Sequence, residues 1–197
     1  TSTIDQDDFK DGKNHATNYS TTTLTTAQST TESNINITAS AVTGINGGAG
    51  FQTTDVGRII SFNSGKAKIT ARSSTTVVAC TITTAFTNTN ATEAFNLGAF
   101  SDTTGHPSCV SFFEQRLVFA GTTDEPQTLF FSKAGDYENM TTGTNADDAM
   151  VYTIASNQVN AIRYMKAVRT LVVGTTGGEF TVSADGTDAS ITPVSYT

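Results

Sequence analysis

The stretches RLVFAGTT (116–123) and RTLVVGTT (169–176) decide the fold of this chain. They lie 53 residues apart, the arginine, the glycine and both threonines are identical, and three of the four positions between the arginine and the glycine are apolar in both copies. One strand-like run precedes each copy and two follow it, so each unit is predicted to hold four short strands. The predicted strands are 109–113, 116–123, 128–136 and 150–155, then 159–165, 169–176, 179–186 and 189–195.

A period of about fifty residues with four strands is typical of a propeller blade. A blade is a small sheet that cannot bury both of its faces alone, so it needs a neighbour on each side. We therefore expect residues 101–197 to form two propeller-blade-like repeats related by a rotation. The alternative is a chance similarity between two β-hairpins.

Residues 51–100 predict a small antiparallel β module. Strands are expected over 56–62, 66–72 and 76–86, joined by tight turns rich in Asn, Gly and Ser. Such a meander needs a partner layer or closure into a small barrel to bury its apolar face. The candidate core aromatics are Phe51, Phe62, Phe86, Phe95 and Phe100.

Residues 1–50 form a polar, Thr-rich segment, which is expected to supply edge strands or to act as a linker. The run SNINITASAV (33–42) alternates as one strand would. The run GINGGAG (44–50) predicts a flexible turn or linker.

The composition favours an all-β fold. Threonine makes up roughly one residue in five, and its branched Cβ suits a pleated strand better than a helix. Hydrophobic residues are 37% and charged residues 15% of the chain, and strong helix formers are scarce. The fold expected for the whole chain is therefore a small antiparallel β module followed by propeller-blade-like four-stranded units.

The net charge of −7 argues against a nucleic-acid-binding surface. Such a surface needs clustered Lys and Arg to displace counterions from phosphates, whereas this chain has 11 basic and 18 acidic residues. The nearest basic group is formed by Lys10, Lys13, Arg58, Lys66, Lys68 and Arg72. Within it, the even spacing of Lys66, Lys68 and Arg72 predicts one shared strand face.

Both cysteines, Cys80 and Cys109, lie in apolar strand-like runs and are expected to be buried free thiols. A disulfide between them stays open as the alternative. No run is long and apolar enough to span a membrane, and no signal-peptide pattern is present. The chain lacks an initiator Met and stops in a strand-like run, so it is expected to be an internal piece or a matured product of something longer.

No motif in the sequence predicts catalytic, cofactor-binding or metal-binding residues. Two histidines, His15 and His106, lie in polar stretches without metal-ligand spacing, and the acidic run 5–12 fails the calcium-loop template. The run GTTGGEF (174–180) lacks the lysine of a phosphate-binding loop. Acids that could serve glycoside hydrolysis exist, but their convergence is not readable from sequence: Glu114, Asp124, Glu125 and Glu179. The pairs Asp147–Asp148 and Asp185–Asp188 have turn compositions.

The stretch GHPSCVSFFEQRLVFAGTTDEPQTLFFSKAGD (105–136) resembles the tail nozzle proteins, or tail tubular protein B-like proteins, of short-tailed bacteriophages. The later stretch 145–182 also resembles that family, and 51–70 resembles the small β module that often precedes it. The chain departs from the family in having no Trp near Phe95, Phe100 and Phe130. The residues that fit the family motif are Gly105, Pro107, Gln115, Arg116, Leu117, Gly121, Thr122, Pro126, Gln127, Thr128, Ser132, Gly135, Asp136 and Tyr137.

This resemblance implies a virion structural protein of the tail and not an enzyme. It implies a homo-oligomeric ring through which DNA passes in transit without tight binding, and which docks an adaptor or portal ring and fibres. It carries over no catalytic residue or cofactor, and it implies structural roles for Arg116 and Asp136. Two other functions stay open: a carbohydrate- or receptor-binding adhesin domain, and a propeller-type hydrolase with convergent carboxylates.

Overall fold

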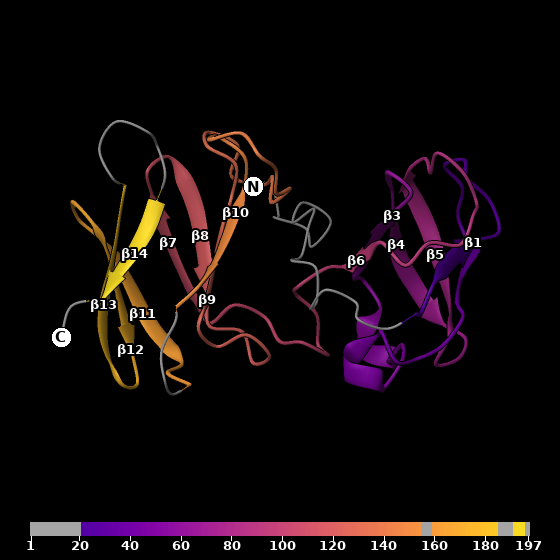
Figure 1. The fold of residues 1–197 in the computed structure, drawn as a ribbon, viewed down its shortest axis with the longest axis horizontal. Helices are drawn as coiled ribbons and strands as arrows, with labels where there is room; N and C mark the ends of the chain where they lie inside the picture. The colour runs from indigo at the N-terminus through magenta and orange to yellow at the C-terminus, as the bar shows by residue number, and fades with distance from the viewer. Residues whose placement is uncertain (1–20, 155–158, 185–190, 196–197) are drawn as a thin grey trace. The chain divides into compact units, whose positions relative to one another are not determined.

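The computed structural model describes residues 21–154, 159–184 and 191–195, and it is all-β as predicted. The chain divides after Thr103 into two compact units. The first unit is one antiparallel sheet of six strands, and the second holds two antiparallel sheets of four strands (Figure 1).

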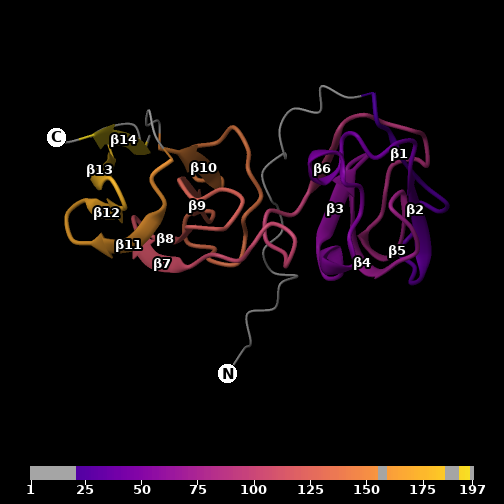
Figure 2. The same ribbon diagram turned by 90° about the horizontal axis from the view of Figure 1, so that it is seen from below.

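The first unit contains the three predicted strands of the β module. Its strands are β1 (Leu24–Thr26), β2 (Ile35–Ala39), β3 (Ile59–Phe62), β4 (Gly65–Arg72), β5 (Val77–Thr84) and β6 (Phe95–Leu97). They follow the order β1-β2-β5-β4-β3-β6, so the Thr-rich segment supplies two strands at one side of the sheet. Leu24 and Thr92 exchange two backbone hydrogen bonds, which join β1 to the segment just before β6 and curl the sheet (Figure 2).

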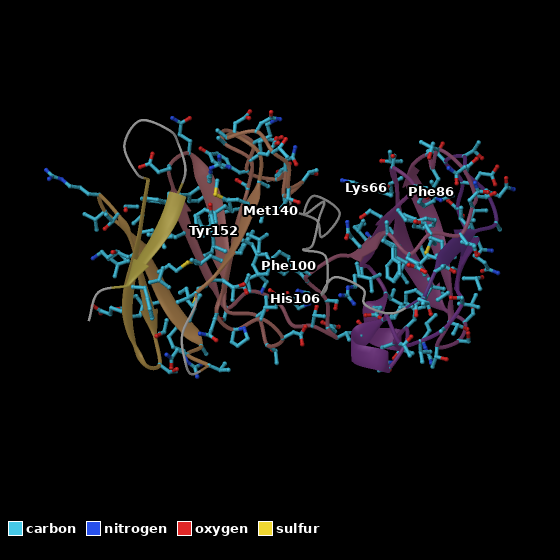
Figure 3. The ribbon with its side chains drawn as sticks, viewed as in Figure 1. Lys66, Phe86, Phe100, His106, Met140 and Tyr152 are labelled. Atoms are coloured by element: carbon cyan, nitrogen blue, oxygen red, sulfur yellow. The ribbon has the colours of Figure 1, made fainter. Side chains whose placement is uncertain are left out.

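The curled sheet encloses an aromatic and aliphatic core. Phe62 and Phe86 stack with their ring centroids 4.4 Å apart, and Figure 3 shows Phe86 among the side chains of this unit. The predicted core aromatics Phe51 and Phe95 are buried as well, while Phe100 is half-buried.

Residues 44–50 form a turn, one of the two alternatives predicted for them, and do not act as a linker. Two short 3-10 turns, η2 (Asn46–Gly48) and η3 (Thr53–Asp55), fold this region onto the sheet. Ile45 and Phe51 flank the glycines and are fully buried in the core, so they tie the turn to the sheet on both sides.

The prediction that Lys66, Lys68 and Arg72 share one strand face is wrong. Lys66 and Lys68 alternate with the buried residues Ala67 and Ile69, but a register shift follows Ile69. An extra residue in a strand reverses the alternation of side chains beyond it. Arg72 therefore pairs with the buried Val78 and donates from Nε to the carbonyl of Phe51 at 2.7 Å.

The second unit contains all eight strands predicted for the repeats. The first sheet holds β7 (Cys109–Phe113), β8 (Arg116–Ala120), β9 (Thr128–Phe131) and β10 (Met150–Thr153). The second holds β11 (Ile162–Ala167), β12 (Leu171–Thr175), β13 (Gly178–Ala184) and β14 (Ile191–Ser195). Each sheet is a simple meander in which consecutive strands are neighbours, as in a propeller blade.

The two sheets share one hydrophobic core. We call the faces that meet in it the inner faces. The first sheet contributes Cys109, Phe113, Val118, Ala120, Leu129 and Phe131, and the second contributes Ile162, Leu171, Val173 and Val182. The opposite faces are the outer faces: Val110 and Phe112 lie on the outer face of the first sheet, and Tyr164, Lys166 and Val172 on that of the second.

The inner face of the first sheet is not the structural equivalent of the inner face of the second, as the backbone hydrogen bonds of β8 and β12 show. In β8 the carbonyl of Ala120 accepts from Ser108, which precedes β7, so the inner-face residues Val118 and Ala120 direct their backbone groups to the preceding strand. In β12 the amide of Thr176 donates to Ala161, which precedes β11. By alternation, the inner-face residues of β12 direct their backbone groups to the following strand.

In an antiparallel meander of L-amino acids, the face to which a side chain points determines whether its backbone groups bond the preceding or the following strand. The first sheet therefore uses one face of the blade and the second uses the opposite face. The sheets stack head to tail, which is the relation between neighbouring blades of a propeller and differs from a face-to-face sandwich.

Residues that are structurally equivalent in the two sheets lie 54 residues apart, and not 53 as the sequence repeat indicated. Leu117 and Leu171 both direct their backbone groups to the following strand, so they are counterparts at an offset of 54, obtained as 171 − 117. Arg116 then corresponds to Thr170. Arg169, its match in the sequence repeat, is an exposed turn residue.

Candidate functional site

Arg116 lies in the middle of the region that resembles the family motif. Its side chain is buried, and its guanidinium lies among the backbone carbonyls of one loop and the end of β9. Nη1 donates to the carbonyls of Ser132 and Asp148 at 2.7 Å each and to that of Asp147 at 3.2 Å. Nη2 donates to the carbonyl of Ala146 at 2.6 Å. A planar guanidinium suits this arrangement because it presents several donors in fixed directions.

Two carboxylates compensate the charge of Arg116. Burial lowers the pKa of its guanidinium, while the nearby Asp147 and Asp148 carboxylates raise it. The same carboxylates lie 3.6 and 3.8 Å from the ammonium of Lys133. Asp148 also accepts from the amide and side chain of Asn145 at 3.0 Å each, so the predicted Asp147–Asp148 turn is an anchored loop.

The motif residues near Arg116 build the framework around it. Ser132 Oγ accepts from the amide of Leu117 at 2.9 Å and donates to the carbonyl of Lys133 at 3.0 Å. The Gln115 carbonyl accepts from the amide of Gly135 at 2.8 Å, which links the β7–β8 turn to the turn after β9. Asp136 is exposed, and its backbone donates to Lys133 and accepts from Asn139 in that turn.

The other motif residues lie at the opposite end of β8. Gly121 has a φ of +74°, and a Cβ there would lie 2.5 Å from Ser108 Oγ and 3.0 Å from the carbonyl of Ile162. Gly105 has a φ of +87°, and a Cβ there would lie 2.7 Å from the backbone nitrogen of Thr123. The Pro126 carbonyl accepts from the amide of Ile162 at 2.9 Å, which joins the two sheets. Pro107 is half-buried just before β7.

The motif residues thus form two structural groups, one around Arg116 and one at the contact between the sheets. In the described part of the chain, these motif residues do not come together in one site. The hydrogen bonds of Arg116 all go to backbone carbonyls of the same unit.

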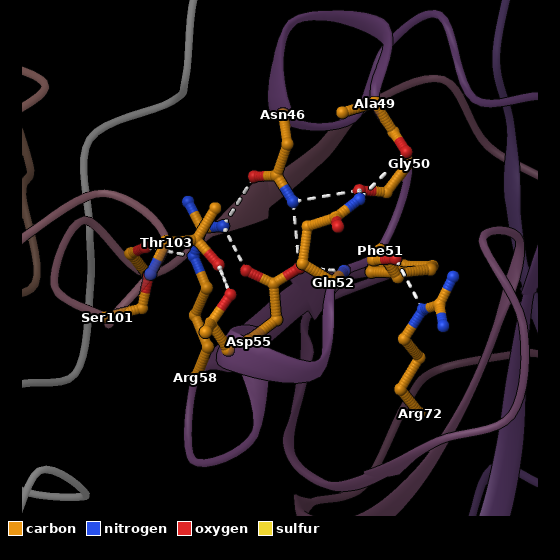
Figure 4. A network of polar contacts seen from close by, with 12 residues as sticks. Asn46, Ala49, Gly50, Phe51, Gln52, Asp55, Arg58, Arg72, Ser101 and Thr103 are labelled. Carbon is orange, nitrogen blue, oxygen red and sulfur yellow. Dashed lines mark hydrogen bonds and ion pairs between the residues drawn. The ribbon is translucent and has the colours of Figure 1, made fainter.

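A second buried polar network lies in the first unit and was not identified from the sequence (Figure 4). Asp55 and Arg58 form an ion pair of 3.1 Å with both side chains fully buried. Asn46 accepts from Arg58 Nη1 at 2.8 Å and donates to Asp55 Oδ2 at 2.7 Å. Arg58 Nε donates to the carbonyl of Gly98 at 2.5 Å, and the Gln52 amide donates to Asp55 at 2.7 Å. Only the spacing of Asp55 and Arg58 was visible in the sequence, and it is too common to be a signal.

The candidate carboxylates for hydrolysis do not all lie at one end of the sheets. Glu114 lies in the β7–β8 turn, whereas Asp124 and Glu125 follow the other end of β8. Glu179 lies on β13 and accepts a hydrogen bond from the hydroxyl of Tyr164. That contact raises the pKa of Tyr164.

No cluster of three His, Cys, Asp or Glu side chains that could hold a metal ion occurs in residues 21–154 and 159–183. His106 is exposed, as expected. His15, the acidic run 5–12 and the pair Asp185–Asp188 lie outside the described residues.

Both cysteines are buried free thiols, as predicted. Burial raises the pKa of the Cys80 thiol to about 12. Within the described ranges, no helix is long and apolar enough to cross a membrane.

No protein-family model matches the chain, and no curated protein sequence is significantly similar to it.

Proposed function

We propose that this chain is a non-catalytic structural subunit of the nozzle ring in the tail of a short-tailed bacteriophage. The observation that carries the proposal is the motif region 105–137, which resembles the nozzle family and whose polar residues are used to hold strands and loops together. In this proposal the ring is homo-oligomeric, forms the conduit for DNA ejection and docks other tail proteins.

Two further features support this role. The two sheets of the second unit stack head to tail, as neighbouring blades of a propeller do, and such blades occur in larger β assemblies. The chain also carries 18 acidic and 11 basic residues, so a conduit built from it would let DNA pass without counterion-driven attraction.

An adhesin domain that binds carbohydrate or a receptor is the second candidate, because one aromatic ring lies in a suitable place. Tyr164 is 45% exposed, and its ring covers Gly174, where a Cβ would lie 1.9 Å from Cε1. Its hydroxyl donates to Glu179. An exposed aromatic ring can stack on a sugar, and a carboxylate beside it can accept hydrogen bonds from the sugar hydroxyls.

Electron microscopy of the purified full chain, together with a glycan-binding assay, separates the two candidates. A closed ring with a central channel and no glycan binding is expected for the nozzle subunit. An isolated monomer that binds a glycan, and loses that binding in Tyr164→Ala, would overturn the nozzle proposal in favour of the adhesin.

A further inference from the structure

The glycine-rich turn of the first unit contains the one Asn-Gly pair of the sequence, Asn46 and Gly47. Both residues have a positive φ, of +48° and +64°. Asn and Gly adopt this conformation at a lower cost than other residues, so the turn itself explains why they occur here. The same pair is chemically reactive, because glycine has no Cβ to shield its backbone nitrogen from the asparagine side chain before it.

The reaction open to this pair is deamidation. The backbone nitrogen of Gly47, after losing its proton to hydroxide, attacks Cγ of Asn46. A C–N bond forms, a succinimide ring closes, and the Nδ2 group takes up a proton and leaves as ammonia. Water then opens the ring at either carbonyl, which leaves aspartate or isoaspartate at position 46. The net change exchanges ammonia for one water and needs no other reactant.

The folded chain holds the carboxamide of Asn46 by three hydrogen bonds. Nδ2 donates to Oδ2 of the buried Asp55 at 2.7 Å and to the carbonyl of Gly50 at 3.0 Å. Oδ1 accepts from Nη1 of Arg58 at 2.8 Å, and Figure 4 shows the side chain directed toward this ion pair. Because Nδ2 is the leaving group, ring closure breaks both of its hydrogen bonds, and one of them goes to a buried charge.

We propose that Asn46 is a deamidation site that the Asp55–Arg58 pair keeps unreactive while the first unit is folded. Gly47 is exposed, so water and hydroxide reach the pair, and the hydrogen bonds of the Asn46 side chain are what slows the reaction. Local opening of the turn frees the carboxamide and permits ring closure.

The reaction products do not fit the arrangement that Asn46 leaves. In the aspartate product a carboxylate oxygen takes the place of Nδ2, 2.7 Å from Asp55 Oδ2, so two acceptors of like charge face each other beside one guanidinium. Isoaspartate adds a carbon to the backbone between Ile45 and Phe51, both of which are fully buried. Deamidation therefore converts a reversible opening of the turn into a permanent loss of stability in the first unit.

The rate of deamidation at Asn46 in the full chain tests the protection by the fold. Peptide mass analysis measures this rate in mildly alkaline buffer, for the folded wild type and for the wild type unfolded in urea. The folded chain is expected to react at least about tenfold more slowly, since breaking a hydrogen bond to a charged group slows a step by about that factor. Equal rates in the two states, or no reaction in urea, would overturn the proposal.

Asp55→Ala tests the role of the ion pair, and Glu93→Ala, which removes an exposed carboxylate of the same unit, is its control. In native buffer Asn46 should react faster in Asp55→Ala than in the wild type, and at the wild-type rate in Glu93→Ala. Circular dichroism checks each fold, and Asp55→Asn replaces Asp55→Ala if the latter is unfolded, because an amide keeps the shape and weakens the hydrogen bond. A folded Asp55 variant that reacts no faster than the control refutes the role of the pair.

Urea unfolding of Asn46→Asp tests the consequence of the reaction. This variant carries the aspartate product from the start, so it should be less stable than the wild type. It should also be less stable than Asn36→Asp, which adds the same charge at an exposed position of β2. Chain that has deamidated in urea should likewise refold less completely than unreacted chain. Wild-type stability in Asn46→Asp, or complete refolding of the deamidated chain, would show that the modification does no lasting damage.

Discussion

Asp55 and Arg58 form an ion pair that is fully buried in the first unit, with 3.1 Å between Oδ1 and Nη1. Asn46 bonds both members, and the Gln52 amide bonds the carboxylate from the start of the second 3-10 turn. The pair therefore fixes the glycine-rich turn and the start of β3 to each other. Buried charges of this kind are tolerated only when their partners are in place.

Replacing Asp55 by Ala should destabilise the first unit strongly. The change leaves the Arg58 charge buried without its carboxylate, which typically costs about 3–5 kcal/mol. Urea unfolding of the full chain measures the loss. The control is Glu93→Ala, which removes an exposed carboxylate. A loss no greater than that of the control would show that the pair does not hold the turn.

Replacing Arg116 by Lys should destabilise the second unit, although the charge is kept. A lysine ammonium cannot reach the carbonyls of Ser132, Ala146 and Asp148 together, so we expect a loss of about 2–3 kcal/mol in the free energy of unfolding. Arg169→Lys is the matched control, because Arg169 has the same place in the sequence repeat but is exposed in a turn. Equal effects of the two changes would contradict the structural distinction between them.

The strands were predictable because their alternation and turn residues are local properties of the sequence. Both sheets of the second unit contain the four strands expected of them. The faces were harder to predict, because a shift of one residue moves every side chain to the opposite face. The identities at Arg116 and Arg169 favoured an offset of 53, whereas the backbone hydrogen bonds require 54 in the strands. The predicted face of Arg72 was wrong for the same reason, because a register shift follows Ile69.

The candidate site was predictable only in part. The resemblance drew attention to Arg116, but its acceptors are backbone carbonyls between 16 and 32 residues further along, and carbonyls have no sequence signature. The Asp55–Arg58 pair depends on Asn46 and Gly98, which lie 12 and 40 residues from Arg58 along the chain. Such contacts between distant segments are not encoded in a local pattern.

The β7–β8 turn should become more stable when its two central residues are replaced by Asn and Gly. Glu114 and Gln115 have φ values of +47° and +57°, a conformation that costs ordinary residues about 1–2 kcal/mol. Two-residue hairpins of this kind favour Asn-Gly. The double change Glu114→Asn and Gln115→Gly should raise the free energy of unfolding by about 1 kcal/mol. Gln115→Val should lower it, and a gain in the valine variant would contradict the argument.

Alkaline pH should destabilise the first unit through Cys80. Burial raises the pKa of this thiol from an ordinary value of 9.0 to about 12, so the unfolded chain ionises first. The contribution of the neutral thiol is complete below pH 9.0 and is lost as the pH rises toward 12. The expected loss is about 1.4 kcal/mol per pH unit in that window.

The measurement compares urea unfolding at about pH 8 and about pH 10 for the wild type and for Cys80→Ala. Other groups titrate in the same range in both proteins, so the difference between their slopes isolates the thiol. The alanine variant is less stable at both pH values because it leaves a cavity, but it should lack the additional loss at high pH. Parallel slopes would show that Cys80 ionises as easily in the folded protein as in the unfolded chain.

Duplex DNA should not bind the full chain appreciably at physiological salt. Affinity for phosphates requires several neighbouring cations, and the excess of 18 acidic over 11 basic residues opposes it. The structure reduces the predicted basic group of β4 to Lys66 and Lys68, because Arg72 bonds the Phe51 carbonyl from the inward face. With only two lysines, a plot of log affinity against log salt concentration would have a slope of only about −2.

A gel-shift titration of the assembled protein across salt concentrations tests this expectation. Lys66→Ser with Lys68→Ser is the informative variant, since both side chains lie on the outward face of β4 and their loss should leave the core intact. Arg72→Ser is unsuitable, because it removes a hydrogen bond to the backbone. Tight binding that weakens steeply with salt and disappears in the double variant would make this strand a DNA-binding surface. In that case the proposed conduit would hold the DNA that it is meant to release.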